Sequence, residues 1–167
     1  MAREKHENNS LAAKAAWPLL ILTAVLQVYF GLSAVAYPFM GVSTPASGLG
    51  GWTEATMGGL QAVAAVIAFM LAVQRDLRGA TLAVAGSIML GWLSTLPSVF
   101  EQGLDFYGDS KLTPVYFGAP PIVAIAAATL AWRNVYPIAA SFIVSAMTFV
   151  GILFVIAFAL VIAMYGF

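Results

Sequence analysis

Five stretches of the sequence contain no charged residue, and this pattern restricts the fold more than any other feature. They cover residues 15–53, 55–74, 79–100, 112–132 and 134–167. A helix needs roughly 20 residues to cross about 30 Å of hydrocarbon, and none of these stretches is shorter than that. Because charged side chains are costly at the centre of a bilayer, the uncharged stretches mark the membrane spans. We therefore predict an all-α, polytopic transmembrane bundle, with a four-helix core and one long C-terminal helix.

The expected organisation is a cytoplasmic N-terminal tail (residues 1–14) followed by one transmembrane helical domain (residues 15–167). The first uncharged stretch is far longer than the 7–15-residue apolar core of a signal peptide, so we expect an uncleaved first span. The spans are expected near Trp17–Pro38, Trp52–Val73, Ala80–Ser98, Val115–Trp132 and Pro137–Tyr165.

Composition supports a membrane protein and excludes several kinds of chemistry. The chain is 62% hydrophobic and 8% charged, whereas a soluble domain is about a quarter charged. A net charge of zero gives no reason to expect a nucleic-acid partner. The chain has no cysteine and a single histidine, His6, in the polar tail, so thiolate metal sites and a haem held by two histidines are excluded within it. We expect no cofactor, and we expect the lipid bilayer, other membrane subunits or further copies of the chain as partners.

The lysines and arginines predict the orientation. Under the five-span scheme only Lys111 falls on the side opposite the N-terminus. The positive-inside rule then places the N-terminus in the cytoplasm and the C-terminus outside, in the inner membrane if the organism is bacterial. The basic residues on the cytoplasmic side are Arg3, Lys5, Lys14, Arg75, Arg78 and Arg133.

Helical spacing separates packed faces from lipid-facing ones. Small and polar residues recur every three or four positions in the first, second, third and fifth spans, so we expect these to form a compact bundle. Pro120-Pro121 should kink or unwind the fourth span. The last apolar stretch is long enough to tilt and leave an overhanging end. The second span carries Leu60, Val63, Ile67 and Met70 on its lipid-facing side, and Glu54, Gly58, Gln61, Ala65, Ala68 and Ala72 on its packed side.

Two glutamines, Gln27 and Gln61, lie near the middle of the first two spans. Antiparallel neighbours would place them at similar depth. They either form a hydrogen bond that joins two helices, worth about 1 kcal/mol, or line a substrate cavity. Trp92 also lies deep in its span, where it packs inside the bundle or lines a pocket.

The candidate for acid–base chemistry is Glu54, the only acidic residue that opens a span. It shares a face with Gln61, and Glu101 or Asp105 offers a second carboxylate or a substrate contact. The alternative is that Glu54 is a hydrated charge at the N-terminus of its helix. The acidic loop around Asp105 lacks the spacing of a calcium loop, so we predict no metal site.

Three segments resemble the small four-helix membrane proteins of the DoxX-like type. They are GLSAVAYPF at residues 31–39, TEATMGGLQA at 53–62 and the turn RDLRGA at 75–80. The resemblance covers about residues 20–100 and implies a four-helix membrane fold. Many members of that group are accessory subunits of membrane redox systems. The fifth span departs from the pattern, and the resemblance carries no catalytic residue onto this chain.

Three functions remain open after this reading. The first is a non-catalytic subunit or accessory factor of a membrane system, which fits the scarcity of ionisable groups within the spans. The second is a small membrane enzyme acting on a lipid-like or isoprenoid substrate, with Glu54 as acid or base. The third is a transporter or channel protomer that works as an oligomer. No phosphate-binding, nucleophile-elbow or zinc-protease motif is present in the sequence.

Overall fold

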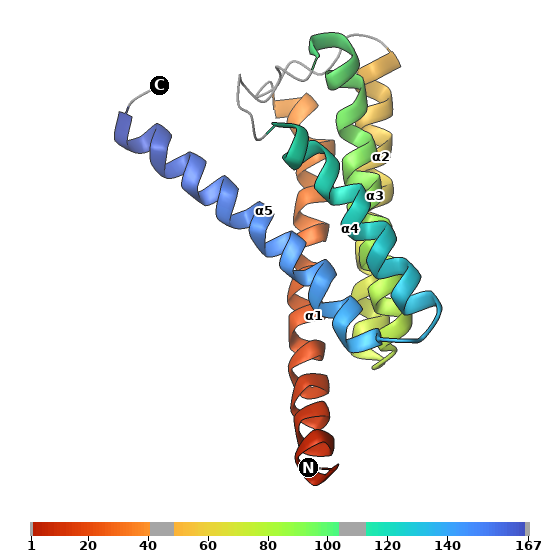
Figure 1. Cartoon of the computed structure of the whole chain (residues 1–167). Helices are drawn as coiled ribbons and strands as arrows, with labels where there is room; N and C mark the ends of the chain where they lie inside the picture. The colour runs from red at the N-terminus through yellow and green to blue at the C-terminus, as the bar shows by residue number, and fades with distance from the viewer. Residues whose placement is uncertain (1, 41–48, 104–112, 166–167) are drawn as a thin grey trace.

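The computed structural model of the protein describes residues 2–40, 49–103 and 113–165. Over these residues the chain is all-helical with five helices, which confirms the predicted fold class at that level. The last helix begins and ends at the predicted residues. The ends of the other helices lie within a few residues of the predicted ends, except for the start of the first helix. In chain order, as Figure 1 shows, the helices are α1 (Ala2–Met40), α2 (Leu49–Val73), α3 (Leu77–Gln102), α4 (Thr113–Trp132) and α5 (Pro137–Tyr165).

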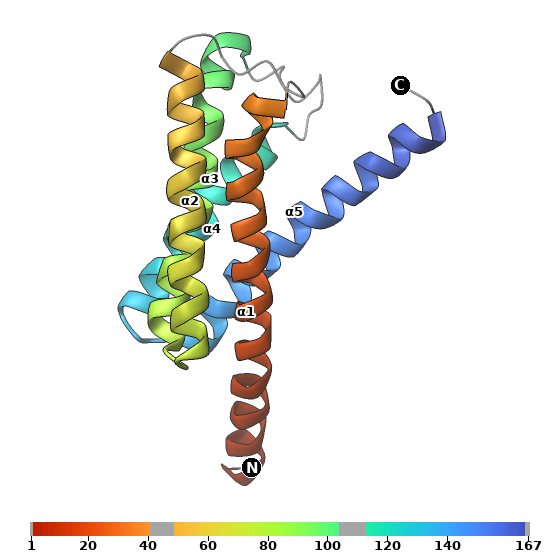
Figure 2. The same cartoon turned by 180° about the vertical axis from the view of Figure 1, so that it is seen from behind.

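Helix α1 begins at Ala2, so the helix start predicted near Trp17 is wrong, while the cytoplasmic location of residues 1–14 stays a prediction. Residues 2–16 contain no glycine, proline or β-branched residue and are rich in Ala, Glu, Lys and Arg. Nothing in this segment stops a helix from propagating outward from the apolar part. The N-terminal turns of α1 therefore project beyond the rest of the bundle (Figures 1 and 2).

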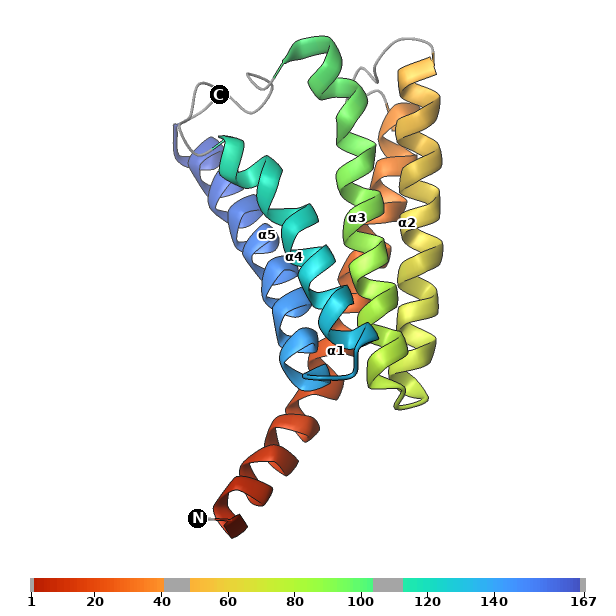
Figure 3. The ribbon, with the colours of Figure 1, turned by 45° about the vertical axis from the view of Figure 1, so that its right-hand side comes forward.

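Helices α1, α2 and α3 run side by side in alternating directions, and α4 and α5 pack beside them (Figures 1, 2 and 3). Helix α4 packs against α3 and α5, so it belongs to the bundle together with the four helices that the sequence pattern indicated. The helix is continuous through Pro120 and Pro121, so of the two expected effects of this pair the unwinding is wrong, and the kink stays a prediction.

Two of the connections are tight turns at the same end of the bundle (Figure 1). Arg75 after α2 and Asn134 after α4 have positive φ angles of 63° and 53°. In each turn the N–H of this residue and the N–H of the next one bond to carbonyls in the last turn of the preceding helix, which is the Schellman arrangement. Asp76 then caps α3 by accepting a hydrogen bond from the N–H of Gly79 at 2.9 Å. Both reversals are therefore encoded locally.

Three segments of the described residues are long and apolar enough to cross a membrane. They are Leu11–Ala36, Gly50–Val73 and Leu77–Phe100; α4 and α5 contain the shorter apolar segments Phe117–Trp132 and Pro137–Leu153. This supports a membrane protein with three candidate spans. Helix α5 is inclined to α1 and its C-terminal half leaves the bundle (Figure 1), where Leu153 and Met164 are 66% and 74% exposed.

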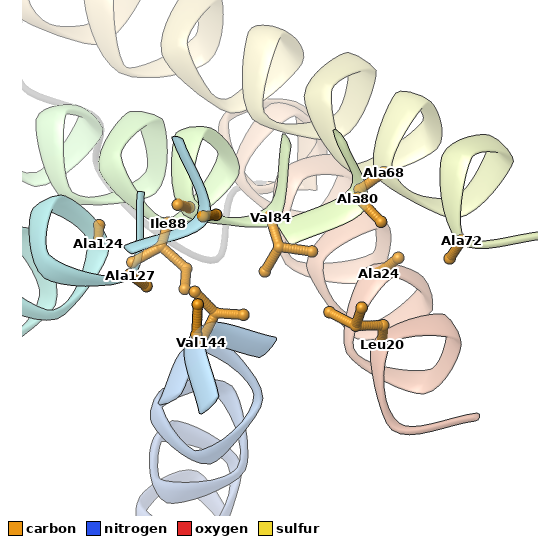
Figure 4. Packing of buried hydrophobic residues seen from close by; sticks show 13 residues of the cluster. Leu20, Ala24, Ala68, Ala72, Ala80, Val84, Ile88, Ala124, Ala127 and Val144 are labelled. Carbon is orange, nitrogen blue, oxygen red and sulfur yellow. The ribbon is translucent and has the colours of Figure 1, made fainter. Parts of the chain in front are cut away.

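The core consists mainly of alanine, which lets the helices approach closely. Figure 4 shows this cluster, in which Leu20, Val84 and Val144 are the largest fully buried apolar side chains. Glycine allows the closest approach: a Cβ added to Gly31 of α1 would lie 2.6 Å from the backbone nitrogen of Ala62 in α2. Small residues at contacts and large ones outside are the packing expected in lipid. The predicted lipid-facing residues are indeed exposed, namely Leu60, Val63, Ile67 and Met70.

Candidate functional site

A chain of hydrogen bonds between uncharged side chains joins four helices near the middle of the bundle. Gln61 of α2 donates from Nε2 to Oε1 of Gln27 in α1 at 2.9 Å. Gln27 donates from its own Nε2 to Oγ1 of Thr148 in α5 at 3.0 Å. Ser87 of α3 lies 3.3 Å from both Gln27 Oε1 and the backbone oxygen of Gln61, and its hydroxyl can donate to either. All four side chains are buried, so each bond replaces one that water would otherwise supply.

The network forms part of the wall of a cavity of about 320 Å³ between α1, α2, α3, α4 and α5. The residues that line the cavity lie away from the end that carries the two tight turns. At this other end the ribbons of α4 and α5 diverge from those of α3 and α1 (Figure 3). Most of the wall is apolar or aromatic, and none of the described lining residues is ionisable. Besides the network residues Gln27, Gln61 and Thr148, the lining includes Phe30, Ala34, Ile88, Gly91, Trp92, Ser94, Thr95, Phe117, Pro120, Met147 and Gly151.

The tryptophan in this wall compensates for a defect in α4. Pro121 has no N–H and cannot donate to the carbonyl of Phe117, four residues earlier. The indole Nε1 of Trp92 in α3 donates to that carbonyl oxygen at 2.8 Å. The rings of Trp92 and Phe117 also pack with their centroids 5.3 Å apart. This contact links α4 to α3, and it supplies the donor that Pro121 lacks.

The network leaves hydrogen-bonding capacity on the cavity side. Gln61 uses its Nε2 as a donor, and no residue that the structure describes donates to its Oε1. Each carboxamide has two N–H groups, and each uses one of them in a bond within the described part of the chain. Gln61 and Gln27 both line the cavity, so these unused groups belong to side chains of its wall.

The structure brings together part of the predicted site. Gln27 and Gln61 bond directly, as one interpretation required, and also line a cavity, as the other required. Glu54 lies half-buried near the start of α2 and is not among the described lining residues. Glu101 is near the end of α3, and its side chain is outside the described residues, as is Asp105. A role for these carboxylates stays a prediction.

Ser87 and Thr148 were not predicted as part of the site, although both are among the small and polar residues that recur along the third and fifth predicted spans. Both lie at the depth of the glutamines, and that shared depth was the available signal. Phe117 and Pro120 were missed entirely as lining residues. The signal for Phe117 was present in the proline pair, because the carbonyl four residues before Pro121 must find another donor.

Comparisons of the chain with protein-family models, with curated proteins and with solved structures found no match. The likeness to the DoxX-like proteins therefore stays a prediction from the three sequence segments that carry it.

Proposed function

We propose that the protein is a non-catalytic subunit or accessory factor of a membrane system, which binds an apolar molecule with a neutral polar head in its central cavity. The observation that carries this proposal is the bonded pair Gln27–Gln61, set in a wall that is otherwise mainly apolar. Ligand sites are typically apolar clefts with a few polar groups that fix orientation. Here Gln27, Gln61 and Thr148 contribute polar groups from α1, α2 and α5, and Ser94 and Thr95 contribute from α3.

The chemistry of the wall favours a neutral head group over a charged one. The described lining offers carboxamides and hydroxyls but no ionisable side chain, so it offers a buried charge no partner. A hydroxyl fits the spare groups well: it can donate to Gln61 Oε1 and accept from a free amide N–H. The volume of about 320 Å³ suits a head group and the first part of a chain, with the remainder among lipid tails.

The absence of ionisable groups from the described lining also favours binding over catalysis. General acid–base catalysis needs a titratable group within hydrogen-bond reach of the reacting atom. Glu54 is the nearest candidate by sequence, but it lies two helical turns from Gln61 and outside the described lining. Binding of a neutral molecule, unlike acid–base catalysis, therefore needs no side chain beyond those of the hydrogen-bonded network.

The same proposal includes a topology. All five helices cross the membrane, with the N-terminus in the cytoplasm and, in a bacterium, in the inner membrane. Every lysine and arginine in the described residues belongs to the end with the N-terminus and the two tight turns, which supports this orientation. In this arrangement the cavity lies in the outer half of the bundle, between α3 and the diverging helices α4 and α5.

Photolabelling with a C20 isoprenoid alcohol that carries a diazirine tests the proposal. The purified protein in neutral detergent is labelled with the alcohol or with the matching hydrocarbon, and the labelled peptide is identified by mass spectrometry. We expect the alcohol to label the cavity wall around Thr95 or Phe117 and to be recovered unchanged when it is not crosslinked. Two hydrogen bonds at about 0.6 kcal/mol each predict that it binds about fivefold to tenfold more tightly than the hydrocarbon.

Three variants make the test specific. Gln61→Met removes the amide and should abolish the preference for the alcohol. Gly151→Leu adds a side chain to the cavity wall at a position where no atom of the described residues lies within 4 Å of the added Cβ, so it should reduce labelling without disturbing the fold. Gln74→Met is the matched control, because Gln74 is exposed just after α2 and outside the described lining. Equal labelling by alcohol and hydrocarbon, or full labelling of Gln61→Met, contradicts the proposal.

A further inference from the structure

A second cleft lies at the opposite end of the bundle from the central cavity. It is formed by α1 and the C-terminal end of α2, and its volume is about 570 Å³. The wall combines two basic side chains with apolar ones. Lys14, Trp17 and Ile21 contribute from α1, and Val73 and Arg75 contribute from the end of α2. None of these residues lines the central cavity, so the two sites are separate.

The cleft has a cationic rim without a counter-ion from the described part of the chain. Lys14 and Arg75 are the only charged residues in the part of the lining that the structure describes, and both are exposed. Neither forms an ion pair with a residue that the structure describes. The nearest acidic residue in sequence, Asp76, accepts the helix-capping bond from Gly79. The rim therefore offers two positive charges to a ligand.

The position of Arg75 is fixed by the local backbone. Its left-handed φ of 63° and the bond from its N–H to the carbonyl of Ala72 at 3.0 Å hold the turn. The N–H of Asp76 adds a bond to the carbonyl of Leu71 at 2.9 Å. The root of the Arg75 side chain is thus held at the mouth of the cleft, while Lys14 approaches from α1 on the other wall.

The apolar part of the cleft continues from the basic rim toward the middle of the bundle. Ile21 lies two helical turns beyond Lys14 along α1, and Val73 lies on the bundle side of Arg75 in α2. Trp17 stands between the charged and apolar levels, the position that tryptophan prefers at a membrane surface. An occupant must therefore be anionic at one end and apolar at the other.

We propose that this cleft binds one anionic phospholipid, with its phosphate between Lys14 and Arg75 and an acyl chain along Ile21 and Val73. Arginine can bond two phosphate oxygens at once, and lysine adds a mobile point charge. A net anionic lipid is favoured over a zwitterionic one because the cleft presents two cations and no described acidic side chain. Each cation contributes about fivefold in affinity for an anionic lipid surface.

Native mass spectrometry of the detergent-solubilised protein measures this directly. The protein is titrated with phosphatidylglycerol, with phosphatidylcholine of the same acyl chains, and with inorganic phosphate as a competitor. We expect one phosphatidylglycerol to be retained at concentrations where phosphatidylcholine is not. Millimolar phosphate should fail to displace it, because phosphate lacks the acyl contacts. Equal retention of the two lipids, or displacement by millimolar phosphate, overturns the proposal.

Variants locate the binding within the cleft. Lys14→Gln and Arg75→Gln should each weaken phosphatidylglycerol binding about fivefold, and the double variant about 25-fold. Arg3→Gln is the matched control: it removes one positive charge from the same helix, about three turns from Lys14 and outside the described lining. Lys14→Gln lies in a regular helix and leaves the turn at Arg75 unchanged, so it tests the site even if Arg75→Gln folds poorly. Wild-type affinity in Lys14→Gln, or an equal loss in Arg3→Gln, contradicts the assignment.

Discussion

Replacing Gly31 with alanine tests how closely α1 and α2 must approach. The added Cβ would lie 2.6 Å from the backbone nitrogen of Ala62 and 2.9 Å from its Cα and Cβ. Carbon atoms in contact prefer about 3.5–4.0 Å, so the helices must separate by about 1 Å. The obstacle is backbone on a neighbouring helix, and it cannot be relieved by a change of rotamer.

Two destabilising contributions and one stabilising contribution set the change in the free energy of unfolding. Overpacking of this kind costs about 1–3 kcal/mol. A separation of about 1 Å would also stretch the 2.9 Å bond between Gln61 and Gln27 beyond hydrogen-bonding range, at a cost of about 0.6 kcal/mol. Alanine in place of glycine within a helix returns about 1 kcal/mol. We therefore expect Gly31→Ala to lower the free energy of unfolding by about 0.6–2.6 kcal/mol.

Unfolding in mixed micelles with a rising fraction of sodium dodecyl sulfate, followed by circular dichroism, provides the measurement. Gly59→Ala is the matched control in α2, because its added Cβ would meet only Val35 Cγ2 at 3.9 Å. The control should be neutral or stabilised by up to about 1 kcal/mol, since it keeps the helix propensity gain without the clash. If Gly31→Ala matches or exceeds the wild type in stability, the close approach of α1 and α2 is wrong.

Three further predictions concern the hydrogen bond of Trp92, the turn at Arg75 and the membrane topology. Trp92→Phe should lower the free energy of unfolding by about 1–3 kcal/mol, because it leaves the Phe117 carbonyl unpaired. The loss should be smaller in a Pro121→Ala background, where the N–H of the substituted residue can bond to this carbonyl. Equal losses of stability in melting experiments on the two backgrounds refute this. Arg75→Gly should stabilise the protein by about 1 kcal/mol because glycine adopts the positive φ without strain, so an unchanged melting temperature contradicts it. Reporter fusions should place Gly79 in the cytoplasm and the C-terminus outside, and a cytoplasmic C-terminus would contradict five spans.

The sequence predicted the helices well because the bilayer signal is simple. Charge-free stretches marked all five helices, and the bounds of α5 agree with the structure. The start of α1 was wrong because the boundary of an apolar stretch is not the boundary of a helix. Residues 2–16 are polar but also good helix formers, so the helix continues where hydrophobicity stops.

The site could be predicted only in part. The depth of Gln27 and Gln61 along antiparallel spans was sufficient to bring them together. Their bonds to Thr148 and Ser87 depend on how α3 and α5 rotate about their axes, which alanine packing decides and spacing alone does not. Of the kink or unwinding expected at Pro120-Pro121, the unwinding was wrong. Trp92 on another helix donates to the carbonyl that Pro121 leaves without its helical partner, and the sequence of α4 alone does not contain this bond.

The network around Gln27 also implies an order of assembly during synthesis. Its hydrogen-bonding partners follow it in the chain by 34, 60 and 121 residues, at Gln61, Ser87 and Thr148. A ribosome adds about 5–20 residues per second, so Thr148 is made roughly 6–24 s after Gln27. During that interval α1 is present with a polar amide whose bonds are incomplete. We therefore expect α1 to remain in contact with the insertion machinery or with water, either of which can bond to the amide of Gln27, until α5 has been made and completes the bundle.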